Sequence, residues 1–273
     1  MMMFGFVVLL AIALSAAMAL AWIVALWSGR SGWIDAIWSF AVGAGGVAGS
    51  LVDFEAVSAR QWLVACLVAI WSLRLGVHIA RRTMTGGDDP RYAQLRKEWG
   101  EKYRRKLFWF LQIQAAVALL LALSVTIAAH RSEPGLDLAD IFGVFVLVIA
   151  VLGEGAADRQ LERFKHDPKS KGKVCDIGLW RWSRHPNYFF EWLGWLAYVF
   201  IAVDPTGGYP FGWLTLAGPV VMYWLLVHVS GIPPLEAHMM RSRGDAFRAH
   251  QQRVNAFWPA PKKAIATEKR RVS

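Results

Sequence analysis

Long apolar runs, separated by short polar connections, make up most of this chain. A helix needs about 20 predominantly apolar residues to cross the hydrocarbon core of a bilayer. The first run has no charge from Met1 to Ser28 and no basic segment before it, so we interpret it as a retained span rather than a signal peptide. The pattern predicts seven transmembrane helices, at 3–28, 33–52, 61–80, 107–129, 138–157, 187–204 and 211–231.

Some of these apolar runs contain an ionisable residue. Asp35 lies near the start of the second run, Arg74 lies within the third, and Glu191 lies within the sixth. A charged side chain in the apolar part of a membrane is costly unless it is paired, so such residues are candidates for function. The sixth run also begins with polar residues, a pattern that is equally typical of a half-buried helix.

The composition supports a membrane protein. Hydrophobic residues make up 56% of the chain and charged residues 18%, against about 25% charged in an average soluble domain. The apolar content excludes a disordered chain, and a disulfide scaffold is excluded because the chain has only Cys66 and Cys175. Despite the net charge of +10 we expect no nucleic-acid partner, and the spacing of Cys and His predicts no metal site. The expected fold is an all-α helical bundle that forms a single membrane-embedded domain, 1–273.

The basic residues are distributed unevenly over the connections. When alternate connections are assigned to opposite sides of the membrane, 27 Lys and Arg fall on one side and two, Arg60 and Arg131, on the other. Because basic connections stay in the cytoplasm, the N-terminus is predicted outside and the C-terminus in the cytoplasm. The cytoplasmic segments are then 81–106, 158–186 and 232–273. Their charge suits anionic lipid headgroups or an anionic soluble cofactor.

The densest group of polar residues begins where the fifth span ends. Asp158, Glu162 and Lys165 would share one face of a helix, which is also typical of a solvated helix at a membrane surface. The basic loop that follows includes Lys173. No glycine-rich dinucleotide fingerprint or phosphate loop occurs in the chain, so any nucleotide has to be held by helix ends and loops.

The segment 184–188 leads into the sixth span. Its proline suits the first turn of a helix, which places the following residues at the cytoplasmic end of that span. Asn187 and Glu191 are then spaced i, i+4 and share one face. Glu191 is expected to accept from a ligand amide or hydroxyl, and an ion pair with Arg184 or Arg181 is the alternative. The candidate residues of this segment are Arg184, His185, Asn187, Tyr188 and Glu191.

Asp35 marks a second candidate site, because the predicted topology puts it on the same membrane face as Glu191. It lies between Trp33 and Trp38 in the second span, and His78 approaches that face from the third. An acid at this depth is a functional candidate by default. Two structural alternatives are a cap at the helix start and an ion pair with Arg74.

The order of residues from Asp158 to Glu191 resembles the bacterial branch of the steroid 5α-reductase family. The resemblance rests on Asp158-x-Gln160, Phe164-Lys165, Lys173, Gly178-Leu179-Trp180 and the run from Ser183 to Tyr188, followed by Glu191. The C-terminal pattern Leu235-Glu236, Arg253 and Phe257-Trp258-Pro259 is similar to the end of that family, and the second span is similar to its substrate-side segment.

This resemblance implies an integral-membrane reductase that uses NADPH from the cytosolic side. The implied substrates are 3-oxo-4-ene steroids and related polyprenoid enones, which enter from the membrane lipids, and no obligate protein partner is implied. In a bacterium, the expected location is the inner membrane. The residues implied to bind the cofactor are Asp158, Lys165, Lys173, Arg184, His185, Asn187, Tyr188, Glu191 and Glu236.

Two departures concern the group that polarises the substrate carbonyl. The resemblance implies that Asp35 and Glu191 are catalytic and that Trp33, Trp38 and His78 contact the substrate. Ala36 and Ile79, however, stand where the animal enzymes of this family have Glu and Tyr. The carbonyl-polarising group and the natural substrate therefore stay unassigned, and a protonated Asp35 is one candidate donor.

Two other functions are compatible with the same residues. Membrane methyltransferases of the isoprenylcysteine and phospholipid type have a similar Arg-His-Pro-x-Tyr entry to a helix, and they use S-adenosylmethionine. The basic residues between Asp158 and Lys173 favour the more anionic NADPH. The non-enzymatic alternative is a sterol-binding membrane protein that has lost the chemistry.

Overall fold

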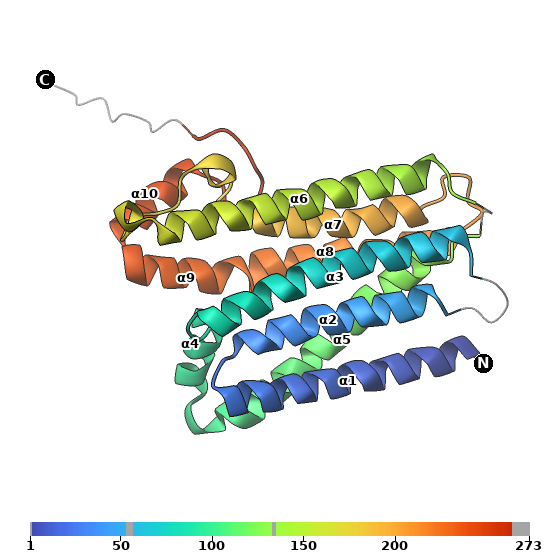
Figure 1. The fold of residues 1–273 in the computed structure, drawn as a ribbon, viewed down its shortest axis with the longest axis horizontal. Helices are drawn as coiled ribbons and strands as arrows, with labels where there is room; N and C mark the ends of the chain where they lie inside the picture. The colour runs from blue at the N-terminus through green and yellow to red at the C-terminus, as the bar shows by residue number, and fades with distance from the viewer. Residues whose placement is uncertain (1, 53–56, 133–134, 264–273) are drawn as a thin grey trace, which may run out of the picture. The chain divides into compact units, whose positions relative to one another are not determined.

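A computed structural model describes residues 2–52, 57–132 and 135–263 of the chain. The regular elements of these residues are all helices, which confirms the predicted all-α class (Figure 1). The chain divides into two compact units, which we describe separately. Unit 1 comprises Met1–Val148 and Leu193–Met222, and unit 2 comprises Ile149–Trp192 and Tyr223–Ser273.

Five helical stretches in the described part of the chain are long and apolar enough to cross a membrane, so the chain is a helical membrane protein, as predicted. Two more of the expected spans form the helices α2 (Gly32–Ser50) and α7 (Pro186–Ala202). Neither is among the five, because α2 contains Asp35 and several glycines and α7 has only 17 residues. The five stretches are Met3–Ser28, Ala59–Thr85, Pro90–Ala129, Leu138–His166 and Pro210–Arg243.

The helices of unit 1 pack around α2. A Cβ atom at Gly43 would lie 2.0 Å from Oγ of Ser72, and one at Gly49 would lie 1.9 Å from Oγ1 of Thr126. Glycine at these positions lets neighbouring helices approach the α2 backbone closely, as small residues do in other membrane bundles. The neighbours of α2 are α1 (Met2–Ser28), α3 (Ala59–Thr85) and α5 (Tyr103–Ala129).

A short helix, α4 (Pro90–Trp99), lies in the basic connection between α3 and α5. Its start follows from the sequence, because Asp89 caps the helix by accepting from the backbone N–H of Arg91, and Pro90 occupies the first turn. This cap fixes the start of α4 and therefore the direction in which the side chains of Arg91 and Tyr92 project from the helix.

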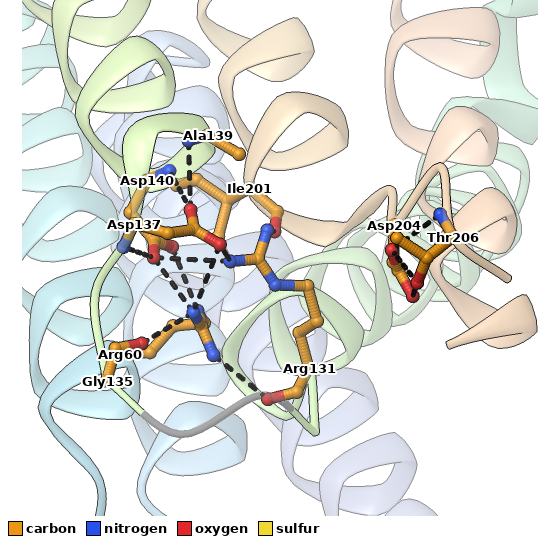
Figure 2. Close-up of polar contacts among 9 residues, drawn as sticks. All are labelled: Arg60, Arg131, Gly135, Asp137, Ala139, Asp140, Ile201, Asp204 and Thr206. Carbon is orange, nitrogen blue, oxygen red and sulfur yellow. Dashed lines mark hydrogen bonds and ion pairs between the residues drawn. The ribbon is translucent and has the colours of Figure 1, made fainter. Parts of the chain in front are cut away.

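Two arginines and two aspartates meet in unit 1 and form what we call the arginine–aspartate cluster (Figure 2). Arg60 binds Asp140 through two hydrogen bonds of 2.9 Å, from Nε to Oδ1 and from Nη2 to Oδ2. Both of these side chains are almost fully buried, at 2% and 1% exposure. Arg131 donates to Asp137 and, at 3.3 Å, to Oδ2 of Asp140. The cluster joins the starts of α3 and α6 (Leu138–His166) to the connection after α5.

Backbone groups satisfy much of the remaining hydrogen-bonding capacity of this cluster (Figure 2). Arg60 donates to the carbonyl oxygens of Arg131 and Gly135 at 3.1 and 2.6 Å, and Arg131 donates to that of Ile201 at 2.6 Å. The backbone N–H of Asp137 donates to Asp140 at 2.9 Å. Good geometry and further hydrogen bonds of this kind are what a buried ion pair needs to offset the cost of desolvation.

Unit 2 contains the second part of α6 and the first turns of α7. The helix α6 continues to His166, so Asp158, Glu162 and Lys165 do lie on one helix. The expected helix 211–231 begins in unit 1 and ends in unit 2, and it is instead divided into a 3₁₀ segment, η4 (Pro210–Leu216), then α8 (Ala217–Trp224) and the π-helix η5 (Leu225–Val229). The rest of unit 2 includes two 3₁₀ turns, η2 (Pro168–Ser170) and η3 (Gly178–Arg181), and the helices α9 (Ile232–Arg243) and α10 (Asp245–Arg253).

The segment that follows α10 is held against the rest of unit 2. The backbone N–H of Ala260 donates to the carbonyl of Trp182 at 3.0 Å. Phe257 is buried, with its ring centroid 5.8 Å from that of Phe189 and 5.2 Å from that of Tyr223. The apolar residues after α10 therefore pack back onto unit 2.

Candidate functional site

Three polar side chains of unit 2 meet at the carboxylate of Glu236 in α9. Arg184 binds Glu236 through two hydrogen bonds, Nε to Oε1 at 2.7 Å and Nη2 to Oε2 at 3.2 Å. Nε2 of His185 lies 3.2 Å from Oε1, and Nε2 of Gln251 donates to Oε2 at 2.7 Å. We call these four residues the Glu236 cluster. Among the described residues, the carboxylate partner of Arg184 is therefore Glu236 and not Glu191, which was the alternative that the sequence left open.

Local backbone contacts hold the Glu236 cluster in place. The N–H of Arg184 donates to the carbonyl of Asn255 at 2.9 Å, and the N–H of His185 donates to Oγ of Ser183 at 3.1 Å. The ring of Tyr188 stacks on that of His185, with centroids 5.5 Å apart and planes 12° apart. Burial lowers the pKa of His185 below its usual value, although Glu236 acts in the opposite direction. His185 is therefore neutral at neutral pH.

Asn187 links the start of α7 to α6. Its Nδ2 atom donates to Oδ1 of Asp158 at 3.3 Å. Its Oδ1 atom is buried and has no hydrogen-bond partner among the described residues. Glu191 lies one turn further along α7 and is 6% exposed. The side chains of Asn187 and Glu191 share a helix face, as their spacing predicts.

The two lysines that the sequence assigns to this site lie in more open positions. Lys165 is exposed near the end of α6, and Lys173 is exposed in the loop after η2. Lys173 also lines a cavity of about 300 Å³ in unit 2. The predicted cofactor residues thus form two groups. The members of one are linked to one another by hydrogen bonds and are largely shielded from solvent, and the other consists of the exposed Lys165 and Lys173.

Unit 1 holds the second candidate site, around Asp35. Asp35 forms an ion pair with Arg91 and accepts a hydrogen bond of 3.0 Å from the hydroxyl of Tyr92. Arg91 also binds Asp89, with two contacts of 2.9 Å. Although burial acts to raise the pKa of Asp89, the guanidinium of Arg91 lowers it overall. The hydroxyl of Tyr92 in turn accepts from Nε2 of Gln114 at 3.3 Å.

The partners of Asp35 differ from those that the sequence suggested. Asp35 neither caps α2, whose N-cap is Ser31, nor pairs with Arg74 in the described part of the chain. Sequence reasoning missed Arg91 and Tyr92 because it treated the connection 81–106 only as a topology signal. The available signal was the Asp-Pro pair at 89–90, which predicts a helix start and hence a fixed direction for the residues after it.

The residues predicted to contact substrate lie on α2 and α3. The indole N–H of Trp38 donates to the backbone carbonyl of Gln114 at 3.1 Å, which ties α2 to α5 close to Tyr92. Trp33 and His78 are half-buried, and Ile79 is buried. Within the described residues, no group of three or more His, Cys, Asp or Glu side chains could hold a metal ion.

Comparison with known proteins gives two matches. A family model described as "Protein of unknown function (DUF1295)" matches residues 21–254. An uncharacterized protein of Schizosaccharomyces pombe, C594.04c, is 26% identical over 273 residues, which cover 87% of this chain and 75% of the yeast protein. No solved structure matches the chain significantly.

Proposed function

The chain belongs to the DUF1295 family, and from the residues that meet in unit 2 we propose that it is a membrane reductase that uses NADPH to reduce the carbon–carbon double bond of a lipophilic enone, such as a 3-oxo-4-ene steroid. The observation that carries this proposal is the buried Oδ1 atom of Asn187, which lacks a partner among the described residues. An amide N–H, such as that of a nicotinamide carboxamide, satisfies an acceptor of this kind.

The surrounding residues also suit this cofactor. Glu191 and Asp158 are acceptors beside Asn187, and they suit the amide and hydroxyl groups of the nicotinamide riboside. The exposed Lys165 and Lys173 suit the phosphates. Arg184, His185 and Glu236 bind one another, so we assign them the role of holding Tyr188 and the start of α7 in position rather than direct contact with phosphate.

Unit 1 offers a donor for the substrate carbonyl. Bound NADPH would supply a hydride to the β-carbon of the enone, and the charge that develops on the carbonyl oxygen needs a hydrogen-bond donor. Both side-chain contacts recorded for Asp35, from Arg91 and from the hydroxyl of Tyr92, use it as an acceptor. We therefore assign polarisation to the hydroxyl of Tyr92, whose proton rotates about the C–O bond, and we give Asp35 the role of orienting Tyr92.

We also propose seven membrane spans, with α2 and α7 added to the five long apolar stretches. In this arrangement the N-terminus is outside, and the C-terminus and the cofactor residues face the cytosol, in the inner membrane of a bacterium. The positive-inside count supports this topology. The two arginines assigned to the outer side, Arg60 and Arg131, are both neutralised within the arginine–aspartate cluster, so they add no exposed positive charge there.

The test is a turnover assay of the purified chain in detergent with NADPH and a panel of steroid enones. We expect NADPH to be oxidised only when an enone is present, and NADPH to bind more tightly than NADH because of the basic residues beside the site. Consumption of S-adenosylmethionine with a lipid acceptor would instead indicate the methyltransferase. Binding of sterol with no turnover of either cofactor would indicate a binding protein.

A further inference from the structure

The cavity that Lys173 lines is a second polar feature of unit 2. It has a volume of about 300 Å³ and lies among the loop 172–176, α10 and Lys262. This is about ten times the ~30 Å³ that one water molecule occupies in the liquid, so the cavity has room for a charged group and part of the molecule that carries it. Its charged and titratable lining residues are Lys173, Asp176, His250, Arg253 and Lys262.

The lining carries an excess of positive charge. Nζ of Lys262 donates to Oδ2 of Asp176 at 2.5 Å, so these two charges neutralise each other. The side chains of Lys173 and Arg253 form no ion pair or hydrogen bond with any described residue. Both side chains are exposed to solvent at the cavity, where they offer two cations to a dianion.

A polar atom of the cavity lining is buried without a partner, and a histidine lines the same cavity. Oδ1 of Asp176 has no hydrogen-bond partner in the described part of the chain. His250 is 9% exposed and lines the same cavity. Burial lowers the pKa of His250, with the charges of Arg184, Lys262 and Arg253 acting in the same direction and Asp176 opposing them, so its imidazole is neutral and offers one donor and one acceptor. Buried polar groups are rarely left unsatisfied, so Oδ1 of Asp176 indicates a donor atom on a ligand, and the neutral ring of His250 can donate to an acceptor on the same ligand.

We propose that this cavity binds a phosphate monoester that carries a hydroxyl or amino group next to the phosphate. A monoester is close to a dianion at neutral pH, which matches Lys173 and Arg253. Its oxygens accept from those cations and from His250, and its neighbouring hydroxyl or amine donates to Oδ1 of Asp176. Two sources share this chemistry, the adenosine 2′-phosphate group of a nucleotide and the glycerol phosphate headgroup of a lipid. The inference does not depend on reductase activity.

The experiment is titration calorimetry on the full chain in detergent, with ligands that lack both nicotinamide and acyl chains. Adenosine 2′-monophosphate is compared with adenosine, and glycerol 3-phosphate with glycerol. We expect at least one monoester to bind 10-fold or more tightly than its dephosphorylated parent, and the stronger of the two identifies the source. Equal binding of each monoester and its parent overturns the proposal.

Matched variants locate the binding. Arg253→Gln should weaken monoester binding about 10-fold or more, because charge-assisted hydrogen bonds to phosphate are among the strongest polar contacts. Arg248→Gln, in the same helix but outside the cavity lining, should leave binding unchanged. The same comparison is made between Lys173→Gln and Lys169→Gln, which keeps the test available if Arg253→Gln fails to fold. Unchanged binding in folded Arg253→Gln or Lys173→Gln overturns the assignment to this cavity.

Discussion

The arginine–aspartate cluster of unit 1 and the Glu236 cluster of unit 2 both contain arginine–carboxylate pairs. They differ in whether the buried acceptors in and next to them have hydrogen-bond partners. In the first, both carboxylate oxygens of Asp140 are bound by side chains, and backbone carbonyls take further donors of Arg60 and Arg131. In the second, Arg184 and Glu236 also form two hydrogen bonds, but the neighbouring Asn187 keeps a buried acceptor without a described partner.

This difference separates a structural role from a binding role. In the arginine–aspartate cluster the buried carboxylate of Asp140 has its partners within the fold, so removal of one member leaves a buried charge without its partner and destabilises the protein. A network that borders on an unsatisfied buried acceptor gains a hydrogen bond when a ligand arrives. Substitutions in the arginine–aspartate cluster should therefore change stability, whereas those around Asn187 should change affinity.

The largest effect is expected from Arg60→Leu. This change leaves the carboxylate of Asp140 buried without its main partner, which costs about 3–5 kcal/mol in comparable cases. Thermal unfolding in detergent should show a large loss of stability, or the protein should fail to accumulate. Arg248→Leu is the control, because its ion pair with Asp245 is exposed and should contribute almost nothing. A stable Arg60→Leu protein that has lost ligand binding would reverse the roles of the two clusters.

The next largest effect concerns Tyr92, which belongs to a third arginine–carboxylate group. Tyr92→Phe removes the proposed donor and should lower kcat about 100-fold, as loss of one such donor does elsewhere, with little change in the affinity for NADPH. Tyr103→Phe is the control, since Tyr103 is also buried but lies outside the Asp35 group. Full turnover of an enone by the Tyr92 variant would show that another group polarises the substrate carbonyl.

The sequence predicted the class of the protein and the position of most helices, because membrane helices need long apolar runs and those are read directly. It also predicted the helix start at Pro186 and the shared face of Asn187 and Glu191, which depend only on local geometry. It did not predict the pairing of Asp35 with Arg91, which are 56 residues apart, or the π-helix within 211–231. Hydropathy contains no information about which distant charges meet or where a helix widens.

Asn187→Ala tests the binding side of the comparison. We expect NADPH to bind about 10-fold more weakly, because the proposed hydrogen bond from the cofactor to Asn187 is lost. The free energy of unfolding should change little. Glu191→Gln should act in the same direction. Asn255→Ala is the matched control, since Asn255 contributes only its backbone carbonyl to unit 2. Calorimetry measures the affinity, and a loss of stability with normal affinity in the folded fraction would make Asn187 a structural residue.

The smallest expected effect is that the two clusters lose their contributions to the free energy of unfolding in different ranges of pH. Burial lowers the pKa of His185, so the unfolded chain binds a proton more readily than the folded one. Its contribution to stability is therefore complete above the unfolded value of 6.5 and is lost as the pH falls below it. The pKa of Asp137 is lowered to about 2 by Arg131, so its contribution is present above the unfolded value of 3.8 and is lost as the pH falls toward 2. Because Asp137 is 47% exposed, solvent screening makes this second contribution small.

Chemical unfolding between pH 7.5 and 5 should thus report on unit 2. His185→Gln should reduce the dependence of the unfolding free energy on pH, and His166→Gln, a change of an exposed histidine, should not. His250 has a lowered pKa as well, so part of the slope should persist in the His185 variant. An unchanged slope in His185→Gln would mean that folding does not lower the pKa of the histidine stacked on Tyr188.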